Sequence, residues 1–211
     1  DETERRVRAE LAAGGAHTAR GKVYLVGAGP GDAELLTLKA ARLLAEADVV
    51  VHDRLVGEDV LRFARREAEF VEMGKRCGSA SARQADINAA LVALARAGKR
   101  VVRLKGGDPF MFGRGGEEML ALMAAGIECE IVPGITAALG CAAYAGIPLT
   151  HREHAHSCVF VTGHRSGGAL DLDWASLARP LQTVCVYMGM ASINRLVDDL
   201  VQAKANAIFM E

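Results

Sequence analysis

The chain has 211 residues, of which 51% are hydrophobic and 24% charged, and its formal net charge is −1. A chain of this length can bury a sizeable core, and its nearly balanced charge argues against a surface that coats a polyanion such as nucleic acid. No apolar run reaches the length of a membrane span, so we predict a soluble globular protein that binds neither nucleic acid nor membrane.

The N-terminal residues 1–20 lack the apolar core of a signal peptide, and we expect a disordered or helical tail there. The cysteines are odd in number, widely spaced and without a C-x-x-C pair, and four of them fall in apolar patterns typical of small buried thiols. They are Cys77, Cys129, Cys141, Cys158 and Cys185. This pattern fits a reducing, cytoplasmic location.

Short apolar runs alternate with helical periodicity along the chain. The apolar runs predict strands at residues 22–27, 47–53, 69–74, 100–104, 128–133, 157–163 and 183–189, with a further strand beginning at 207. The periodic segments predict helices that begin between 32 and 37, at 58–66, from a capping box at 81–84 to Gly98, and at 117–125, 136–144 and 192–204.

The alternation predicts an α/β fold in which helices cover both faces of a parallel sheet, since the strands are apolar almost throughout. The pattern restarts after the fifth predicted strand. We therefore expect an N-terminal α/β domain at 21–133 and a C-terminal α/β domain at 134–211, with the break near Pro133–Gly134.

The first glycine-rich turn, GAGPGD, follows the first predicted strand. Its glycines are Gly27, Gly29 and Gly31, so Asp32 stands where a dinucleotide-binding fingerprint needs its third glycine. Pro30 also removes a backbone donor that a pyrophosphate would use. These features disfavour a nicotinamide oxidoreductase. A ligand-binding turn and a plain strand-to-helix turn both remain open for this segment.

The second glycine-rich stretch, VVRLKGGDPFMFGRGGEE, also begins as a buried strand. Gly106 and Gly107 would let the backbone approach a ligand closely. Asp108, held by the following proline, could accept hydrogen bonds from hydroxyls or an ammonium group, which suits a ligand with a ribose and an amino-acid moiety. Arg114 and Glu117 are one helical turn apart and could form a simple surface ion pair.

Both stretches resemble the signature sequences of uroporphyrinogen-III C-methyltransferases, within the tetrapyrrole methylase family. The segments VVHDRLV, MGKRCG, VPGITAALGCAAYAGIPLTHRE, VTGH and VYMGM are similar to that family in the same order. The resemblance implies two α/β domains with S-adenosylmethionine in the cleft between them, usually in a homodimer. It implies methylation of uroporphyrinogen III at carbons 2 and 7, giving precorrin-2 for sirohaem, cobalamin or haem d1 synthesis.

The same resemblance implies which residues contact the methyl donor. They are Pro30, Gly106, Gly107, Asp108, Met111, Thr136, Ala137 and Met188. From the sequence alone, the two methionines are equally typical of core packing.

For the chemistry, the resemblance implies Asp53 as proton acceptor and Lys75 as proton donor. Arg114, Glu117 and Arg152 match positions that hold the substrate, and Arg114 is also a candidate for assisting deprotonation. An octacarboxylate substrate fits such arginines, because guanidinium groups pair bidentately with carboxylates. Lys105 is a minor candidate for the same role, because lysines at strand ends are commonly just solvated. Asp53 could instead cap the turn at Leu55 or Val56.

The histidines of HREHAH, namely His151, His154 and His156, could suggest a metal site. Their spacing lacks the glutamate of a zinc-protease helix, and Arg152 would oppose a cation, so no metal is expected. His164, at the end of a predicted strand, could touch either ligand.

The chain ends before the usual length of the family, either because it is truncated or because segments are missing; a true truncation would leave the adenine pocket incomplete. Some relatives carry an added dehydrogenase and chelatase module; these residues contain none, so methyl transfer alone is expected. Two alternatives remain: another precorrin C-methyltransferase of the same fold, and a catalytically impaired protein that only binds S-adenosylmethionine.

Overall fold

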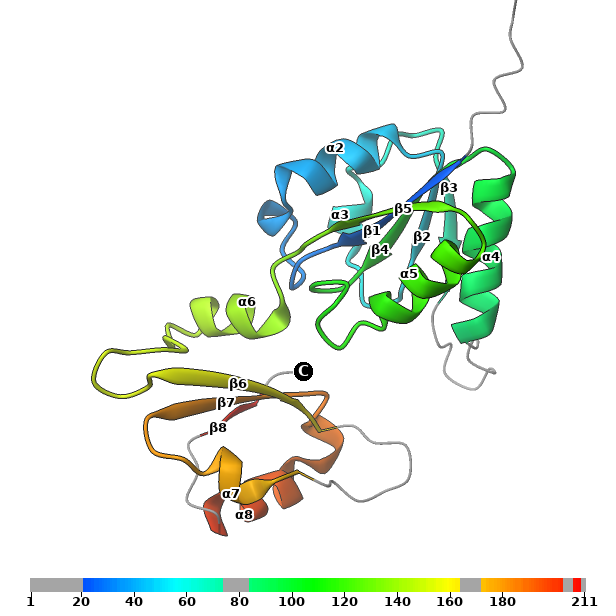
Figure 1. Ribbon diagram of the computed structural model, residues 1–211. Coiled ribbons are helices and arrows are strands. Elements are labelled where there is room, and N and C mark those ends of the chain that lie inside the picture. The colour runs from blue at the N-terminus through cyan, green and yellow to red at the C-terminus, as the bar shows by residue number, and fades with distance from the viewer. Residues whose placement is uncertain (1–20, 74–83, 164–171, 203–206, 210–211) are drawn as a thin grey trace, which may run out of the picture.

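The computed structural model describes residues 21–73, 84–163, 172–202 and 207–209. Two parallel sheets organise this part of the chain, and they lie one after the other in the sequence (Figure 1). Every pairing between neighbouring strands is parallel, which confirms the predicted α/β class.

The N-terminal sheet has the strand order β3-β2-β4-β1-β5. Its strands are β1 (Lys22–Gly27), β2 (Val49–His52), β3 (Glu69–Glu72), β4 (Arg100–Lys105) and β5 (Glu128–Val132). The three strands that have a neighbour on each side, β2, β4 and β1, are mostly buried, as expected for strands covered on both faces.

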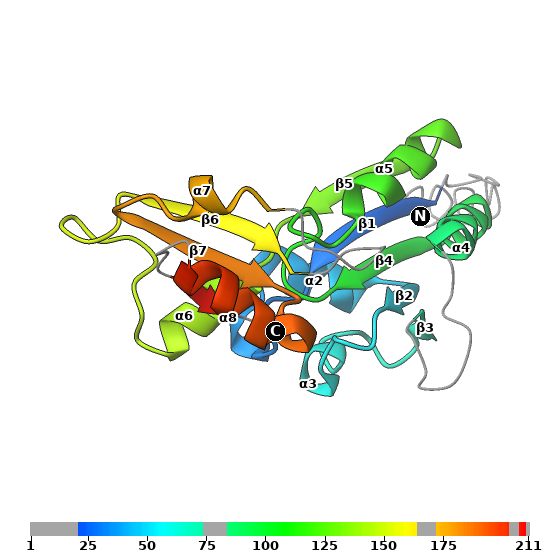
Figure 2. The same ribbon diagram turned by 90° about the horizontal axis from the view of Figure 1, so that it is seen from below.

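Helices cover both faces of this sheet (Figure 2). They are η1 (Ala33–Leu35), α2 (Leu38–Glu46), α3 (Glu58–Leu61), α4 (Gln84–Arg96) and α5 (Gly115–Ala124). Leu43 and Leu44 of α2 join one core cluster with Val26 and Val102, whereas Leu91 and Leu122 of α4 and α5 join the opposite cluster. Alternate residues of a strand point to opposite faces, so Val102 and Leu104 face α2 while Val101 and Arg103 face α4 and α5.

The C-terminal sheet has the order β6-β7-β8. The elements of this half are α6 (Ala137–Tyr144), β6 (Ser157–Thr162), α7 (Trp174–Leu177), β7 (Gln182–Tyr187), η2 (Met190–Ser192), α8 (Ile193–Gln202) and β8 (Ala207–Phe209). Ala138 and Ala142 of α6 pack with Cys185 on one face, and Leu196 of α8 packs with Val184 on the other.

Several local predictions need correction. Helix α3 ends at Leu61 rather than near residue 66, because the chain turns directly afterwards: Phe63 N–H donates to the Val60 carbonyl and Ala64 N–H to that of Leu61. Cys141 is exposed rather than buried, since it lies on the outer face of α6.

Helix α7 was not predicted from the sequence. It forms one short turn in which the Asp173 carboxylate accepts from the Ser176 N–H at 3.1 Å. The first residues of the predicted capping box lie outside the described part of the chain, as does Cys77. Within the described residues, no helix is both long and apolar enough to cross a membrane.

Candidate active site

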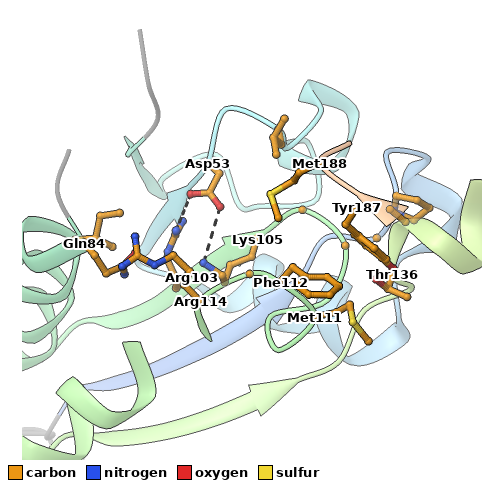
Figure 3. Close-up of a pocket in the computed structure, with 18 residues that line it drawn as sticks. Asp53, Gln84, Arg103, Lys105, Met111, Phe112, Arg114, Thr136, Tyr187 and Met188 are labelled. Atoms are coloured by element: carbon orange, nitrogen blue, oxygen red, sulfur yellow. Dashed lines mark hydrogen bonds and ion pairs between the residues drawn. The ribbon is translucent and has the colours of Figure 1, made fainter. Parts of the chain in front are cut away.

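A cavity of about 410 Å3 lies at the carboxyl ends of β1, β2 and β4, where the C-terminal half meets the first sheet (Figure 3). The carboxyl ends of parallel strands are where open α/β sheets bind ligands. The described residues that line it are Gly29, Pro30, Asp53, Leu55, Gln84, Ile87, Arg103, Lys105, Gly106, Gly107, Met111, Phe112, Gly113, Arg114, Thr136, Ala137, Tyr187 and Met188.

The two glycine-rich turns meet at the floor of this cavity. Gly107 donates its N–H to the Gly29 carbonyl at 2.7 Å, and Gly29 donates to the Gly107 carbonyl at 3.2 Å. Gly134, which follows β5, packs against the same backbone: a Cβ built on it would lie 2.3 Å from the Gly107 carbonyl oxygen. Three segments far apart in sequence therefore cross so closely that side chains cannot fit between them.

Asp108 connects two of these segments. Its Oδ1 accepts from the Phe110 N–H at 2.8 Å, and its Oδ2 accepts from the Gly134 N–H at 3.1 Å. Both carboxylate oxygens thus satisfy backbone donors, which holds the turn after β4 against the segment that enters the C-terminal half.

Backbone strain gathers at the cavity. Phe112, Arg114 and Met188 all line it, and their φ angles are 53°, 58° and 55°, in the left-handed region that non-glycine residues seldom occupy. Residues held in such conformations cluster at functional sites, because the surrounding structure has to maintain them.

A buried cluster of charges forms the wall beside Asp53 (Figure 3). Arg103 Nη2 donates to Asp53 Oδ1 at 2.6 Å, and Arg103 Nε donates to Glu118 Oε1 at 3.2 Å. Lys105 Nζ lies 3.1 Å from the same Glu118 oxygen and 4.0 Å from Asp53 Oδ2. Two cations and two anions are therefore balanced here, and all but Asp53, which is 28% exposed, have almost fully buried side chains. Burial, and secondly repulsion from Arg103, lower the pKa of Lys105 from its ordinary value, while both carboxylates oppose this shift.

Tyr187 joins the C-terminal sheet to the cavity. Its hydroxyl lies 2.7 Å from Thr136 Oγ1 and accepts from the Ala138 N–H at 3.1 Å, so the end of β7 is bonded to the first turn of α6. Its ring also packs against Phe112, with 4.9 Å between the ring centroids.

The family description "Tetrapyrrole (Corrin/Porphyrin) Methylases" matches residues 22–210. The chain belongs to the tetrapyrrole methylase family. Among solved structures, a uroporphyrin-III C-methyltransferase from Thermus thermophilus has a TM-score of 0.75 at 47% identity, over 88% of this chain and 78% of that one. The same enzyme complexed with S-adenosylhomocysteine has a TM-score of 0.74 at 47% identity, over 88% of this chain and 74% of that one.

A cobalt precorrin-4 methyltransferase, described as a cobalamin biosynthetic enzyme, is a more distant member of the fold. It has a TM-score of 0.76 at 27% identity, over 90% of this chain and 77% of that one.

Curated relatives include two sirohaem synthases. The one from Nitrosococcus oceani is 57% identical over 89% of this chain and 40% of the relative, and the one from Methylococcus capsulatus is 59% identical over 92% of this chain and 41% of the relative. The chain therefore spans about two fifths of the length of these curated relatives.

Most residues that the family resemblance pointed to meet at the cavity. Pro30, Asp53, Gly106, Gly107, Met111, Arg114, Thr136, Ala137 and Met188 all line it. The turn after Asp53 is closed by backbone, since the Val56 N–H donates to the Asp53 carbonyl at 3.2 Å, and the Asp53 carboxylate meets Arg103 instead of capping that turn. Both methionines face the cavity, although Met111 also packs against the core of the C-terminal half.

Three other predicted residues do not line the cavity. Asp108 lies behind its floor, and Glu117 holds the exposed side of Arg114 through two contacts of 2.8 and 2.7 Å. This pair lowers the pKa of Glu117 and raises that of Arg114, in each case chiefly through the hydrogen bonds between them. Arg152 is exposed in the turn between α6 and β6.

The predicted proton donor Lys75 lies outside the described residues, as does His164. His151 and His154 stack on each other at 4.6 Å, also away from the cavity. Across the described residues, no group of three or more histidine, cysteine, aspartate or glutamate side chains is arranged to hold a metal ion.

Sequence analysis missed Arg103, Glu118 and Tyr187, and it gave Lys105 little weight. A signal existed for two of them. Arg103 and Lys105 alternate with apolar residues in a strand flanked on both sides by other strands, and charged side chains are seldom fully buried unless they are paired. Glu118 and Tyr187 carried no comparable signal, because an acid on a helix and a tyrosine ending a strand are ordinary features.

Proposed function

We propose that this chain transfers methyl groups from S-adenosylmethionine to carbons 2 and 7 of uroporphyrinogen III, giving precorrin-2. The observation that carries the proposal is the convergence of both signature stretches on one cavity, in a chain 47% identical to a uroporphyrin-III C-methyltransferase that binds S-adenosylhomocysteine. The cobalt precorrin-4 methyltransferase is only 27% identical, which favours the first ring substrate over later ones.

The cavity fits a methyl donor at its glycine-rich side. Its volume of about 410 Å3 lies within the range of roughly 300–1,000 Å3 that is typical of ligand sites. Gly106 presents bare backbone there, and a Cβ added to it would already touch the Leu55 side chain at 3.4 Å. Backbone dipoles suit a sulfonium and an ammonium group, because they attract cations without offering a basic nucleophile.

In this proposal Gly106, Gly107 and Thr136 bind the donor, together with Pro30, Met111, Ala137 and Met188, while Asp108 contributes by holding the turn that carries Gly106 and Gly107. S-adenosylmethionine supplies the methyl group and the sulfonium leaving group. The chain's main task is alignment, because in-line displacement requires the reacting atoms to be held in a near-attack geometry.

The opposite side of the cavity carries the charges for the substrate and the proton. Arg114, supported by Glu117, would bind a substrate carboxylate there. Arg152, which does not line the cavity, is proposed as a second substrate contact because the family pattern implies it. Asp53 would accept the proton that the macrocycle loses to restore neutrality after a ring carbon is methylated, and its Oδ2 is the better placed atom because Oδ1 already accepts from Arg103. We assign Lys75 the role of proton donor, as the family pattern implies.

The test is anaerobic incubation of the protein with S-adenosylmethionine and uroporphyrinogen III, with the transferred methyl groups counted by mass. We expect a doubly methylated product. In equilibrium dialysis, we expect the protein to bind S-adenosylhomocysteine but not NAD. Transfer to precorrin-2 but not to uroporphyrinogen III would assign the chain to another precorrin methyltransferase. Donor binding without transfer to either would identify a protein that only binds the donor.

Asp53→Asn tests whether Asp53 accepts the proton in the chemical step, because asparagine has a similar shape but is not a base. We expect kcat to fall by about 10²–10⁴-fold, the range typical of a lost general base, with unchanged affinity for S-adenosylhomocysteine. Asp59→Asn is its control, since Asp59 is exposed on α3 and pairs only with Arg62 among the described residues. Equal activity of the Asp53 variant and the wild type would remove Asp53 from the mechanism.

We further propose two domains that divide near Pro133–Gly134, and a homodimer that works in the cytoplasm. The strands of each sheet come from one side of that division, which supports it. Large apolar side chains are exposed on α5 and α6, including Leu120, Met123 and Leu139. Their exposure supports the proposal that a second subunit covers this surface. Light scattering coupled to gel filtration tests the dimer, and cell fractionation tests the location.

A further inference from the structure

Glu118 is the member of the charged cluster that does not line the cavity. It lies on α5 with a side chain that is 0% exposed, while Asp53, Arg103 and Lys105 all reach the cavity wall. Its Oε1 is crowded: it accepts from Arg103 Nε at 3.2 Å, Lys105 Nζ at 3.1 Å and Gln84 Nε2 at 3.2 Å.

The other oxygen of Glu118 is unusual. Among the described residues, Oε2 is a buried side-chain atom without a hydrogen-bond partner. A buried carboxylate is costly to desolvate, and apolar residues of similar volume often replace buried ion pairs with no loss of stability. Stability alone is therefore a poor explanation for an ionisable group at this position.

Glu118 is connected to Asp53 through Arg103 and through Lys105. Arg103 uses Nε for Glu118 and Nη2 for Asp53, so one planar guanidinium joins the two carboxylates. Lys105 also lies between them, 3.1 Å from Glu118 and 4.0 Å from Asp53. Only arginine can make both contacts at fixed angles, because its donors form a rigid fork.

We infer that Glu118 is a positioning residue, which fixes Arg103 and Lys105 so that Asp53 is held in one orientation at the cavity wall. The inference rests on the proposed methyl transfer, in which Asp53 accepts the proton. Glu118 acts from behind the wall and touches neither ligand. Without its charge, Arg103 and Lys105 repel each other and the Arg103 guanidinium loses the contact that fixes its Nε, so the Arg103–Asp53 contact is no longer held.

The test compares Glu118→Gln with Glu130→Gln. Glu130 also pairs with cations, Lys22 and Lys39, but it lies on β5 outside the cavity lining, so its variant controls for the loss of a paired charge. For Glu118→Gln we expect kcat to fall at least tenfold, with the KM for uroporphyrinogen III and the affinity for S-adenosylhomocysteine within about twofold of wild type. Arg103→Lys keeps the charge but loses the fork, and it should lower kcat to a similar extent even if Glu118→Gln folds poorly.

A double-mutant cycle with Asp53→Asn separates positioning from a purely structural role. If Glu118 acts through Asp53, adding Glu118→Gln to Asp53→Asn costs less than about twofold in kcat, because the group that it orients is already lost. Losses that multiply fully in the double variant, or wild-type kcat in Glu118→Gln, would overturn the inference.

A wild-type protein that does not methylate uroporphyrinogen III would refute the proposed function instead. The positioning of Asp53 is then decided by crystal structures of the wild type and Glu118→Gln. We expect the Asp53–Arg103 contact to lengthen beyond hydrogen-bonding distance in the variant. An unchanged contact would overturn the inference independently of activity.

Discussion

Asp108 shows how one side chain can organise a site without facing its ligand. Its two oxygens accept from Phe110 and Gly134, so the turn after β4 and the segment after β5 are held together by a single carboxylate. A carboxylate suits this place because it is an acceptor at both oxygens, whereas an amide must direct its NH2 group at one of the two N–H donors.

We therefore predict that Asp108→Asn lowers the free energy of unfolding by about 1–3 kcal/mol, the usual cost of leaving a buried donor unsatisfied. The affinity for S-adenosylhomocysteine should fall at least tenfold, because the displaced turn carries Gly106 and Gly107. Urea denaturation and calorimetric titration measure the two effects, with Asp59→Asn as the control. Wild-type stability and affinity in the Asp108 variant would contradict this account.

At the scale of elements, the ends of β1, β4 and β5 come together without side chains between them. A Cβ on Gly134 would lie 2.3 Å from the Gly107 carbonyl oxygen and 2.8 Å from Gly27 Cα. These neighbours are backbone atoms, so they can move only if a whole strand end moves.

Gly134→Ala should accordingly lower the free energy of unfolding by about 1–3 kcal/mol, the usual cost of overpacking, and weaken the binding of S-adenosylhomocysteine. Gly116→Ala is the matched control, since nothing lies within 4 Å of a Cβ at Gly116 and the position is helical. We expect that control to be neutral or up to about 1 kcal/mol more stable than wild type. Chemical denaturation distinguishes these outcomes, and equal stability of both variants would refute the close crossing.

At the other end of β5, ion pairs tie this edge strand to β1 and α2. Lys22 of β1 contacts Glu128 at 2.6 Å and Glu130 at 2.9 Å, and Lys39 of α2 also contacts Glu130. Hydrogen bonds from Lys39 and then Lys22 lower the pKa of Glu130 from 4.5 to about 2.

Because the folded-state pKa of Glu130 is lowered, its contribution is complete above the unfolded value of 4.5 and is lost as pH falls toward about 2. The pairs are partly exposed, so we expect this contribution to be only about 0.5–1 kcal/mol and to shrink in high salt. The measurement is the difference in unfolding free energy between wild type and Glu130→Gln across pH. A difference that stays constant from pH 6 to pH 2 would contradict the prediction.

At the scale of the whole molecule, the cavity depends on how the C-terminal half is joined to the first sheet. Within the C-terminal half, the Tyr187 hydroxyl bonds the end of β7 to the start of α6, where Thr136 and Ala137 line the cavity. The ring of Phe112, from the turn after β4, packs on the same tyrosine.

Tyr187→Phe should keep the ring packing but leave the Ala138 N–H and the Thr136 hydroxyl without this partner. We expect about 1–3 kcal/mol lower stability and faster hydrogen exchange at the start of α6. Tyr144→Phe is the control, because Tyr144 is exposed and its bond to Asp32 faces solvent; its effect should stay within about 0.5 kcal/mol. If hydrogen exchange at α6 were as slow in Tyr187→Phe as in the wild type, the hydroxyl would not be what holds β7 to the start of α6.

Much of the fold could be predicted because its signals are local. Runs such as VYLV and VVRL carry the apolar continuity of strands buried on both faces, and the side chain of Thr37 caps α2 within the range where a helix start was expected. Local signals are weaker for short elements. Helix α3 was predicted too long and α7 was missed, because one helical turn has almost no periodicity to detect.

By itself, the sequence determined the class of fold, the family and the stretches that form the site, because apolar periodicity and glycine spacing are properties of neighbouring residues. Only the tertiary structure decided that Glu118 stands behind Asp53, that Asp108 braces the cavity floor, and that Tyr187 joins β7 to α6. These contacts join residues 15 to 51 positions apart, and they exist because the packing of sheet and helices leaves each buried polar group only a few partners within reach.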